Sequence, residues 1–199
     1  MTLTARPSLE QVAVWVASAL ARSKIRAVLT GGACASLYSK GKYQSSDLDF
    51  ILQSAVTSKE LDAVMEAIGF RRTSNHYEHP RTAFFVEFPA GPLGIGADID
   101  VRPVVYRIGR VGVRVLSATD SCRDRLAGFY HWNDRQSLIT AVHIARNRKV
   151  DLKAIRAWSE REDASDKFSE FLGILRQAPG KGLRPGERAS SCRKRPRHT

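Results

Sequence analysis

The sequence predicts an α+β protein in which a mixed sheet with flanking helices is followed by a C-terminal helical region. Up to about residue 117, short β-branched runs are mixed with amphipathic helical patterns, whereas residues 118–175 show helical spacing only. From residue 176 the chain is basic and rich in Pro and Gly, so we expect a disordered tail. The predicted division of the chain is therefore 1–117, 118–175 and 176–199.

The first 117 residues are predicted to alternate helices with strands. Amphipathic spacing of apolar residues indicates a helix, and a short run of β-branched or aromatic residues indicates a strand. Helices are predicted at 9–20, with Ser8 as N-cap, at 33–38 and at 58–68. Strands are predicted at 27–30, 46–52 and 82–88, with a weak edge strand within 71–79 and a hairpin of 101–106 with 111–116.

Four helices are predicted in the C-terminal region. Thr119, Asp134 and Asp151 carry side chains that can cap a helix N-terminus, so we place three helix starts at these residues. The apolar spacing of residues 167–175 predicts the fourth helix.

The composition excludes several classes of protein. No apolar run approaches the roughly 18 residues that a membrane span requires, and no signal peptide is recognisable, so we expect a cytoplasmic protein without a membrane partner. The three cysteines lack a zinc spacing, and Cys34 and Cys122 are expected to be buried. Much of the net charge of +12 lies in the tail, which is either a solvated extension without a dedicated role or a weak contact for nucleic acid.

The strongest functional signal lies between residues 28 and 52. Gly31 and Gly32 end a predicted strand and open a helix, a turn where backbone N–H groups approach a phosphate closely. Asp47 and Asp49 follow at spacing i and i+2 in the next strand, so both carboxylates project from one face. Two like charges this close repel unless a cation lies between them, and Mg²⁺ is the usual cation. The pattern predicts a magnesium site beside a phosphate cradle.

A third carboxylate is expected at this site. Glu87 is a lone acid in an apolar strand, where it needs a metal, an arginine or solvent as its partner. Asp98 and Asp100 form a second Asp-x-Asp motif and are the rival candidates, although they follow a loop rich in Gly and Pro. The residue pattern leaves the choice between Glu87 and this pair open.

Three motifs together resemble the signature of the nucleotidyltransferase superfamily, with its polymerase-β-like fold, and particularly of its small prokaryotic members. These motifs are Gly31-Gly32, Asp47-x-Asp49 and Glu87 between apolar neighbours. The resemblance covers about residues 8–175, because the segment after Thr119 is similar to the helical segment of uncharacterised nucleotidyltransferases. It implies a nucleotidyltransferase-like core followed by helices.

The resemblance also implies a role for each residue of the motifs. Asp47, Asp49 and Glu87 would be catalytic and would bind one or two Mg²⁺ ions, and Glu87 would accept the proton of the attacking hydroxyl. The substrate would be an NTP, with ATP as the first choice. The residues expected to bind it are Gly31, Gly32, Ser46 and Arg125.

Other polar residues are weaker candidates for the site. Lys42 and Arg135 are further cations that could steady a triphosphate. The segment 130–136 is dense in side chains that stack or hydrogen-bond. It either lines the nucleotide or acceptor pocket, or forms a corner between two helices with Asp134 as N-cap and Trp132 in the core. His76 and His79 lie in a polar stretch without a clear third metal ligand, and we expect them to be solvated.

The predicted activity is Mg²⁺-dependent transfer of a nucleoside monophosphate from an NTP to a hydroxyl of an unknown acceptor. The acceptor would be a protein, a tRNA end or a small molecule such as an aminoglycoside. The alternative is a catalytically weak or inactive relative that senses nucleotides or acts in a toxin–antitoxin pair. A third hypothesis, a nucleic-acid-binding module, rests on the basic tail alone, and a charge run specifies no recognition.

Overall fold

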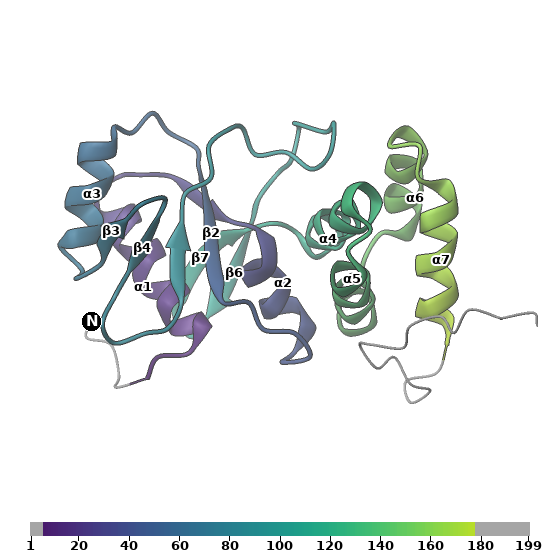
Figure 1. The fold of residues 1–199 in the computed structure, drawn as a ribbon, viewed down its shortest axis with the longest axis horizontal. Helices are drawn as coiled ribbons and strands as arrows, with labels where there is room; N and C mark the ends of the chain where they lie inside the picture. The colour runs from purple at the N-terminus through teal and green to yellow at the C-terminus, as the bar shows by residue number, and fades with distance from the viewer. Residues whose placement is uncertain (1–5, 178–199) are drawn as a thin grey trace, which may run out of the picture.

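Residues 6–177, which the computed structural model describes, form a seven-stranded mixed sheet and seven α-helices (Figure 1). The helices are α1 (Leu9–Arg22), α2 (Gly31–Ser39), α3 (Ser58–Glu66), α4 (Ala118–Trp132), α5 (Arg135–Asn147), α6 (Leu152–Arg161) and α7 (Ser165–Arg176). The strands are β1 (Ala27–Leu29), β2 (Asp47–Leu52), β3 (Arg71–Thr73), β4 (His76–Glu78), β5 (Phe85–Glu87), β6 (Val104–Ile108) and β7 (Val111–Val115). The predicted α+β class is confirmed.

Strand β2 lies at the centre of the sheet, whose spatial order is β3-β4-β5-β2-β1-β7-β6. It pairs antiparallel with β1 and parallel with β5. In the parallel register Asp47 lies opposite Phe85, and Asp49 lies opposite Glu87. Two antiparallel hairpins, β3–β4 and β6–β7, extend the sheet on either side.

Helix α2 joins the sheet to the C-terminal helices. It contacts β2, α4 and α5, and Figure 1 shows it between the sheet and these helices, with α6 and α7 farther out. Its first turns are made of small residues that are buried all round, including Ala33, Cys34 and Ala35. Small side chains let neighbouring elements approach closely, so a single apolar core runs from the sheet into the helical region.

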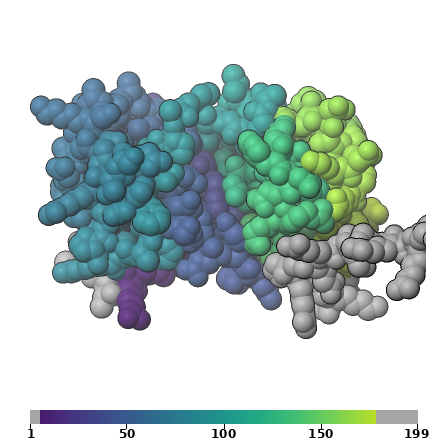
Figure 2. All heavy atoms as spheres, in the orientation of Figure 1, coloured from purple at the N-terminus to yellow at the C-terminus, as the bar shows by residue number. Residues whose placement is uncertain are grey.

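The space-filling view shows the same arrangement from outside (Figure 2). The blue atoms of α2 and its neighbours lie between the sheet-bearing part of the chain and the green α4 and α5. On the other face of the sheet, α1 packs against β1, β7 and α3. Cys34 and Cys122 are buried in the core, as expected.

Several element boundaries differ from the predicted ones. Residues 71–79 form two strands with a tight turn at Ser74 (φ 58°) rather than one edge strand. The strand predicted at 82–88 is only three residues long, β5. The central strand begins at Asp47 rather than Ser46, and α2 begins two residues early, at Gly31.

The N-cap of α4 was placed wrongly at Thr119. Ser117 is the N-cap, and its hydroxyl accepts a hydrogen bond from the Asp120 N–H at 3.0 Å. The Thr119 hydroxyl instead accepts from the Asp151 N–H at 3.0 Å, and so ties the start of α6 to α4. The predicted N-caps Ser8, Asp134 and Asp151 are confirmed.

No helix among residues 6–177 is both long and apolar enough to cross a lipid bilayer. The predicted tail from residue 178 onward lies outside the described residues.

The capping geometry gives a test of the fold. We expect Ser117→Ala to lower the free energy of unfolding by about 1 kcal/mol, because the Asp120 N–H at the start of α4 loses its side-chain acceptor. The matched control is Ser165→Ala, an exposed serine at the start of α7 whose side chain caps nothing, with an expected change within about 0.5 kcal/mol. Urea denaturation of the three proteins measures both, and equal stability of the two variants would contradict the assignment.

Candidate active site

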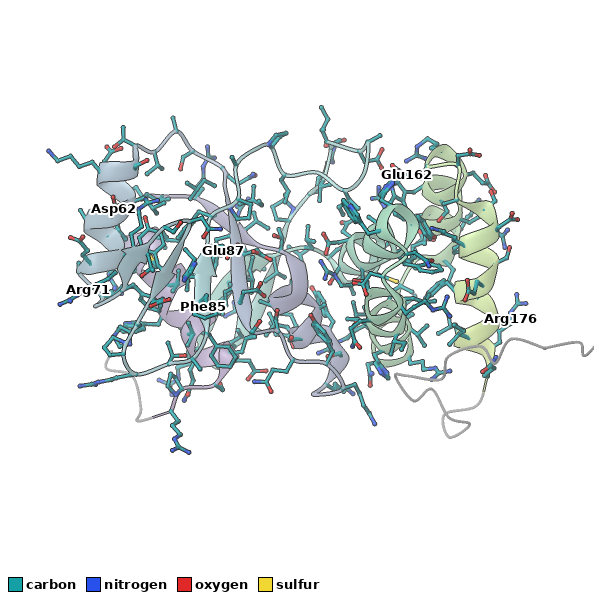
Figure 3. All side chains as sticks on the ribbon, in the orientation of Figure 1. Asp62, Arg71, Phe85, Glu87, Glu162 and Arg176 are labelled. Atoms are coloured by element: carbon teal, nitrogen blue, oxygen red, sulfur yellow. The ribbon has the colours of Figure 1, made fainter. Side chains whose placement is uncertain are left out.

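Three carboxylates project from one face of the two central parallel strands. Asp47 and Asp49 alternate with Leu48 and Phe50, which are buried on the opposite face. Glu87 lies beside Asp49 in the β2–β5 register, because paired residues of adjacent strands point to the same side. Figure 3 shows Glu87 on the central part of the sheet. The structure thus brings together the three acids that the sequence singled out.

The N-terminus of α2 opens directly onto these carboxylates. Gly31 has a φ of 59°, and a Cβ on it would overlap the Asp49 carboxylate, so only glycine fits this close approach. Thr30 is the N-cap but makes no side-chain capping bond, and its hydroxyl points instead to the Asp49 carbonyl at 3.4 Å. The first N–H groups of α2 therefore stay available to an anion. By contrast, α1, α3, α4, α5 and α6 all have side-chain caps.

Ser45 belongs to the site and was missed by the sequence analysis. Its hydroxyl donates to Asp47 Oδ1 at 2.5 Å, and a Cβ on Gly32 would overlap the same hydroxyl. Ser46, which was expected to bind the nucleotide, is exposed, and its carbonyl accepts a hydrogen bond from the Phe85 N–H at 3.2 Å. The alternation 45, 47, 49 along an extended segment was the available signal for Ser45.

Burial and like charge shape the electrostatics of the site. The pKa of Asp49 is raised from 3.8 to about 6, first by burial and then by the charges of Asp47 and Glu87. Arg125 on α4 acts in the opposite direction on Asp49, but its guanidinium is held by Asp124 at 2.6 Å. The excess negative charge at this face is the property that a bound cation would relieve.

The remaining candidate cations lie elsewhere or remain solvated. Arg135 is held by Glu170 on α7 at 2.5 Å and lies over the Phe129 ring. Lys42 is exposed in the turn after α2. The segment 130–136 forms the corner between α4 and α5, with Asp134 as the N-cap of α5. The corner and the Asp134 cap are therefore confirmed, but Trp132 was expected in the core and is 77% exposed.

The rival acids are engaged in other interactions. Asp98 forms ion pairs with Arg123 of α4 and with Arg161 of α6, at 2.9 Å for the latter. The Asp100 side chain is 85% exposed and lies 3.6 Å from Arg102. Since Asp98 already has two guanidinium partners, its charge fastens the loop after β5 to the helices.

The two histidines are not solvated, which corrects the expectation for them. His79 packs between Trp15 and Phe70, with 5.0 Å between ring centroids in both pairs, and burial lowers its pKa. His76 is half-buried, and its Nε2 lies 2.9 Å from the Glu78 carboxylate. Neither residue is part of a metal cluster.

The carboxylate oxygens of the site suit a hard cation such as Mg²⁺, but the protein side chains alone do not form a complete metal site. Within residues 6–177 no group of three or more His, Cys, Asp or Glu side chains is close enough to hold a metal ion. Asp47 and Asp49 supply carboxylate oxygens only, and Mg²⁺ is usually held by one or two carboxylates together with substrate phosphates and water. The residues present fit Mg²⁺ bound in that way.

The chain is similar to known proteins in structure and not in sequence. No protein-family model matches it, and no curated protein is significantly similar in sequence. The crystal structure of an antigenic nucleotidyltransferase-like protein from Paracoccidioides brasiliensis superposes with a TM-score of 0.50 at 18% identity, over 81% of this chain and 92% of that one. The chain has a nucleotidyltransferase-like fold. The solution structure of the antibiotic-resistance factor ANT(2'')-Ia superposes with a TM-score of 0.50 at 15% identity, over 80% of this chain and 96% of that one.

The nucleotidyltransferase-like fold expected from the three motifs is confirmed by these comparisons. The roles of individual residues within the fold are not fixed by such distant similarity, and they stay predictions for this chain.

The raised pKa of Asp49 predicts a pH-dependent penalty on the metal-free protein. The folded state holds the Asp49 proton up to about pH 6, whereas the unfolded chain loses it near 3.8. The penalty is therefore complete above pH 6 and disappears as the pH falls toward 4. We expect Asp49→Asn to be more stable than wild type by about 1–2 kcal/mol at about pH 7.5, a range reduced for partial solvent screening.

Urea denaturation in the presence of a chelator, at about pH 7.5 and about pH 4, measures this difference. The control is Asp100→Asn, whose carboxylate is largely exposed and for which no change in stability is expected. An Asp49→Asn protein that is no more stable than wild type at the higher pH would show that the carboxylates are not strained.

Proposed function

We propose that the protein is a Mg²⁺-dependent nucleotidyltransferase that moves a nucleoside monophosphate from an NTP to a hydroxyl acceptor. One observation carries the proposal: an uncapped helix N-terminus, opened by Gly31 and Gly32, faces Asp47, Asp49 and Glu87 on adjacent strands. An anion site and an acidic site thus meet, which is the arrangement that a metal–triphosphate complex requires. The similarity to solved nucleotidyltransferase structures supports the same activity.

The nucleotide would bind through its phosphates at the start of α2. The N–H groups of the first turn would donate to phosphate oxygens, and the absence of a Cβ at both glycines lets Asp49 and Ser45 pack directly against this turn. Ser45 fixes the Asp47 carboxylate through its hydrogen bond, so one lone pair of Oδ1 is engaged and the others remain for a metal. Arg125, beside Asp124, adds positive charge on the α4 side.

Asp47 and Asp49 would hold Mg²⁺, and the bound ion would supply positive charge that neutralises the phosphates and favours in-line attack on the α-phosphate. The acceptor oxygen forms a bond to the α-phosphorus while the bond from this phosphorus to the bridging oxygen breaks, and pyrophosphate leaves with the electron pair. Glu87 lies beside Asp49 and would take the hydroxyl proton, which it then releases to solvent.

Nucleotide transfer gives the direct test of the proposal. Wild type incubated with Mg²⁺ and α-³²P-labelled NTPs, together with extracts or purified acceptor pools, is expected to release pyrophosphate and to label an acceptor. Asp47→Asn and Asp49→Asn should abolish both signals, since each removes a carboxylate from the metal site. Asp100→Asn is the control with unchanged transfer. Transfer that survives the Asp47→Asn/Asp49→Asn double substitution would refute the metal assignment.

Glu87→Gln separates proton transfer from nucleotide binding. Because the amide keeps the shape of the side chain but cannot accept the proton, we expect the transfer rate to fall by about 100-fold or more. The affinity for Mg²⁺ with a non-transferable ATP analogue, measured by calorimetry, should change by less than about threefold. A Glu87→Gln enzyme with full activity would remove Glu87 from the mechanism.

A further inference from the structure

The carboxylate face of the sheet continues beyond β5 onto the β4–β3 hairpin. The registers place Asp47 opposite Phe85 and Arg71 opposite Glu78. Continuing the antiparallel β4–β5 register, in which Tyr77 pairs with Val86, puts Glu78 beside Phe85. One row of side chains therefore crosses four strands from Asp47 to Arg71. In Figure 3, Glu87 and Phe85 lie on β5, and Arg71 lies farther out on β3.

A cavity of about 390 Å³ lies along this row. Its lining includes Arg71, Thr73 and Glu78 from the hairpin, Phe84 and Phe85 at the start of β5, and Thr82 from the preceding turn. A cavity of this size holds a small organic molecule. The cavity begins at Phe85, one strand away from Asp47. Because adjacent strands are about 4.8 Å apart, Arg71, three strands away, lies roughly 14 Å from Asp47.

The chemistry of the lining is asymmetric. Phe85 is 39% exposed as a residue and lines the cavity, and its ring centroid lies 4.8 Å from that of His76. The cavity therefore has a flat apolar surface. Glu78 is already engaged by His76 at 2.9 Å. The Arg71 guanidinium has no hydrogen bond or ion pair with any other residue in the described part of the chain. The cavity therefore has a free positive charge and an aromatic platform.

We propose that this cavity binds the body of the hydroxyl acceptor, and that the acceptor carries a planar ring and an anionic group, either phosphate or carboxylate. The ring stacks on Phe85, and Arg71 binds the anionic group. The acceptor hydroxyl then points back toward Asp47 and Glu87, roughly 10 Å from its anionic end. There its oxygen attacks the α-phosphorus, pyrophosphate leaves, and Glu87 takes the proton. This inference rests on the proposed nucleotidyl transfer for its last step only.

Three probes with a common naphthalene ring test the ligand class without knowledge of the acceptor. 1-Naphthyl phosphate, 1-naphthoate and 1-naphthylmethylammonium share one ring and differ in charge, and the first two separate the two sources of anion. Calorimetric titration of the metal-free full chain is expected to show binding of at least one anionic probe at least about tenfold tighter than the cationic one. The probe should still bind when Mg²⁺ and a non-transferable ATP analogue are present at saturating concentrations, because the probe occupies a different part of the carboxylate face.

Two substitutions and one control locate the binding. Arg71→Gln should weaken the preferred anionic probe about tenfold and leave the cationic probe unchanged, and Phe85→Leu should weaken all three probes. The control is Arg110→Gln, an exposed arginine in the turn between β6 and β7 that should change nothing. All of these residues are exposed, and circular dichroism verifies that each variant is folded.

The outcomes separate this inference from the proposed function. Four results would each overturn the proposed acceptor class, whether or not nucleotide transfer occurs. They are equal or tighter binding of the cationic probe, no binding of any probe, displacement of the probe by the ATP analogue, and an unchanged probe affinity in Arg71→Gln. Arg71-dependent binding of an anionic probe without any nucleotide transfer would sustain the anion site and refute the transferase activity. If transfer does occur, Arg71→Gln should raise the KM for the acceptor and leave the KM for the NTP unchanged.

Discussion

Repulsion among carboxylates on the central strands is the constraint on which the site depends. Asp47, Asp49 and Glu87 share one face because β2 and β5 run parallel in a fixed register, and the burial of Leu48 and Val86 on the other face holds that register. Burial, together with the neighbouring charges of Asp47 and Glu87, raises the pKa of Asp49 to about 6, so the ionised carboxylate destabilises the metal-free fold. Strain of this kind is retained where a ligand relieves it, and a metal–triphosphate complex would do so.

Helix α2 connects the strained face to the rest of the molecule. Its small residues allow contact with β2, α4 and α5 at once, so the start of the helix is held rigidly against Asp49. At the other end, the Tyr38 hydroxyl donates to the Leu116 carbonyl at 2.8 Å just before α4 begins. The same helix therefore offers its N–H groups to an anion and fixes the position of α4, which carries Asp124 and Arg125. Phosphate binding and the placement of the helical region share one element.

The sequence predicted the local features of the site and missed those set by pairing. Glycine pairs, i and i+2 acids and the caps Asp134 and Asp151 follow from covalent geometry and hydrogen-bonding range, which act within a few residues. Ser117 and Thr119 are both able to cap α4, and the choice depended on Asp151, which lies far along the chain. Ser45 was missed because it precedes the strand, where the alternation of side chains was not expected to continue.

By itself, the sequence determined that two glycines begin a helix and that two aspartates share one face of the strand that follows it. Spacing along an extended chain fixes which side chains share a face. Only the tertiary structure decided which acid lies beside Asp47 and Asp49 as the third carboxylate. Glu87 lies beside Asp49 because β5 pairs with β2, whereas Asp98 is taken by Arg123 and Arg161 from two helices. Strand pairing and the choice of ion-pair partners depend on contacts between distant segments, and a single sequence does not encode their outcome locally. The row of side chains from Asp47 to Arg71 also depends on strand pairing, so it can be recognised only in the folded sheet.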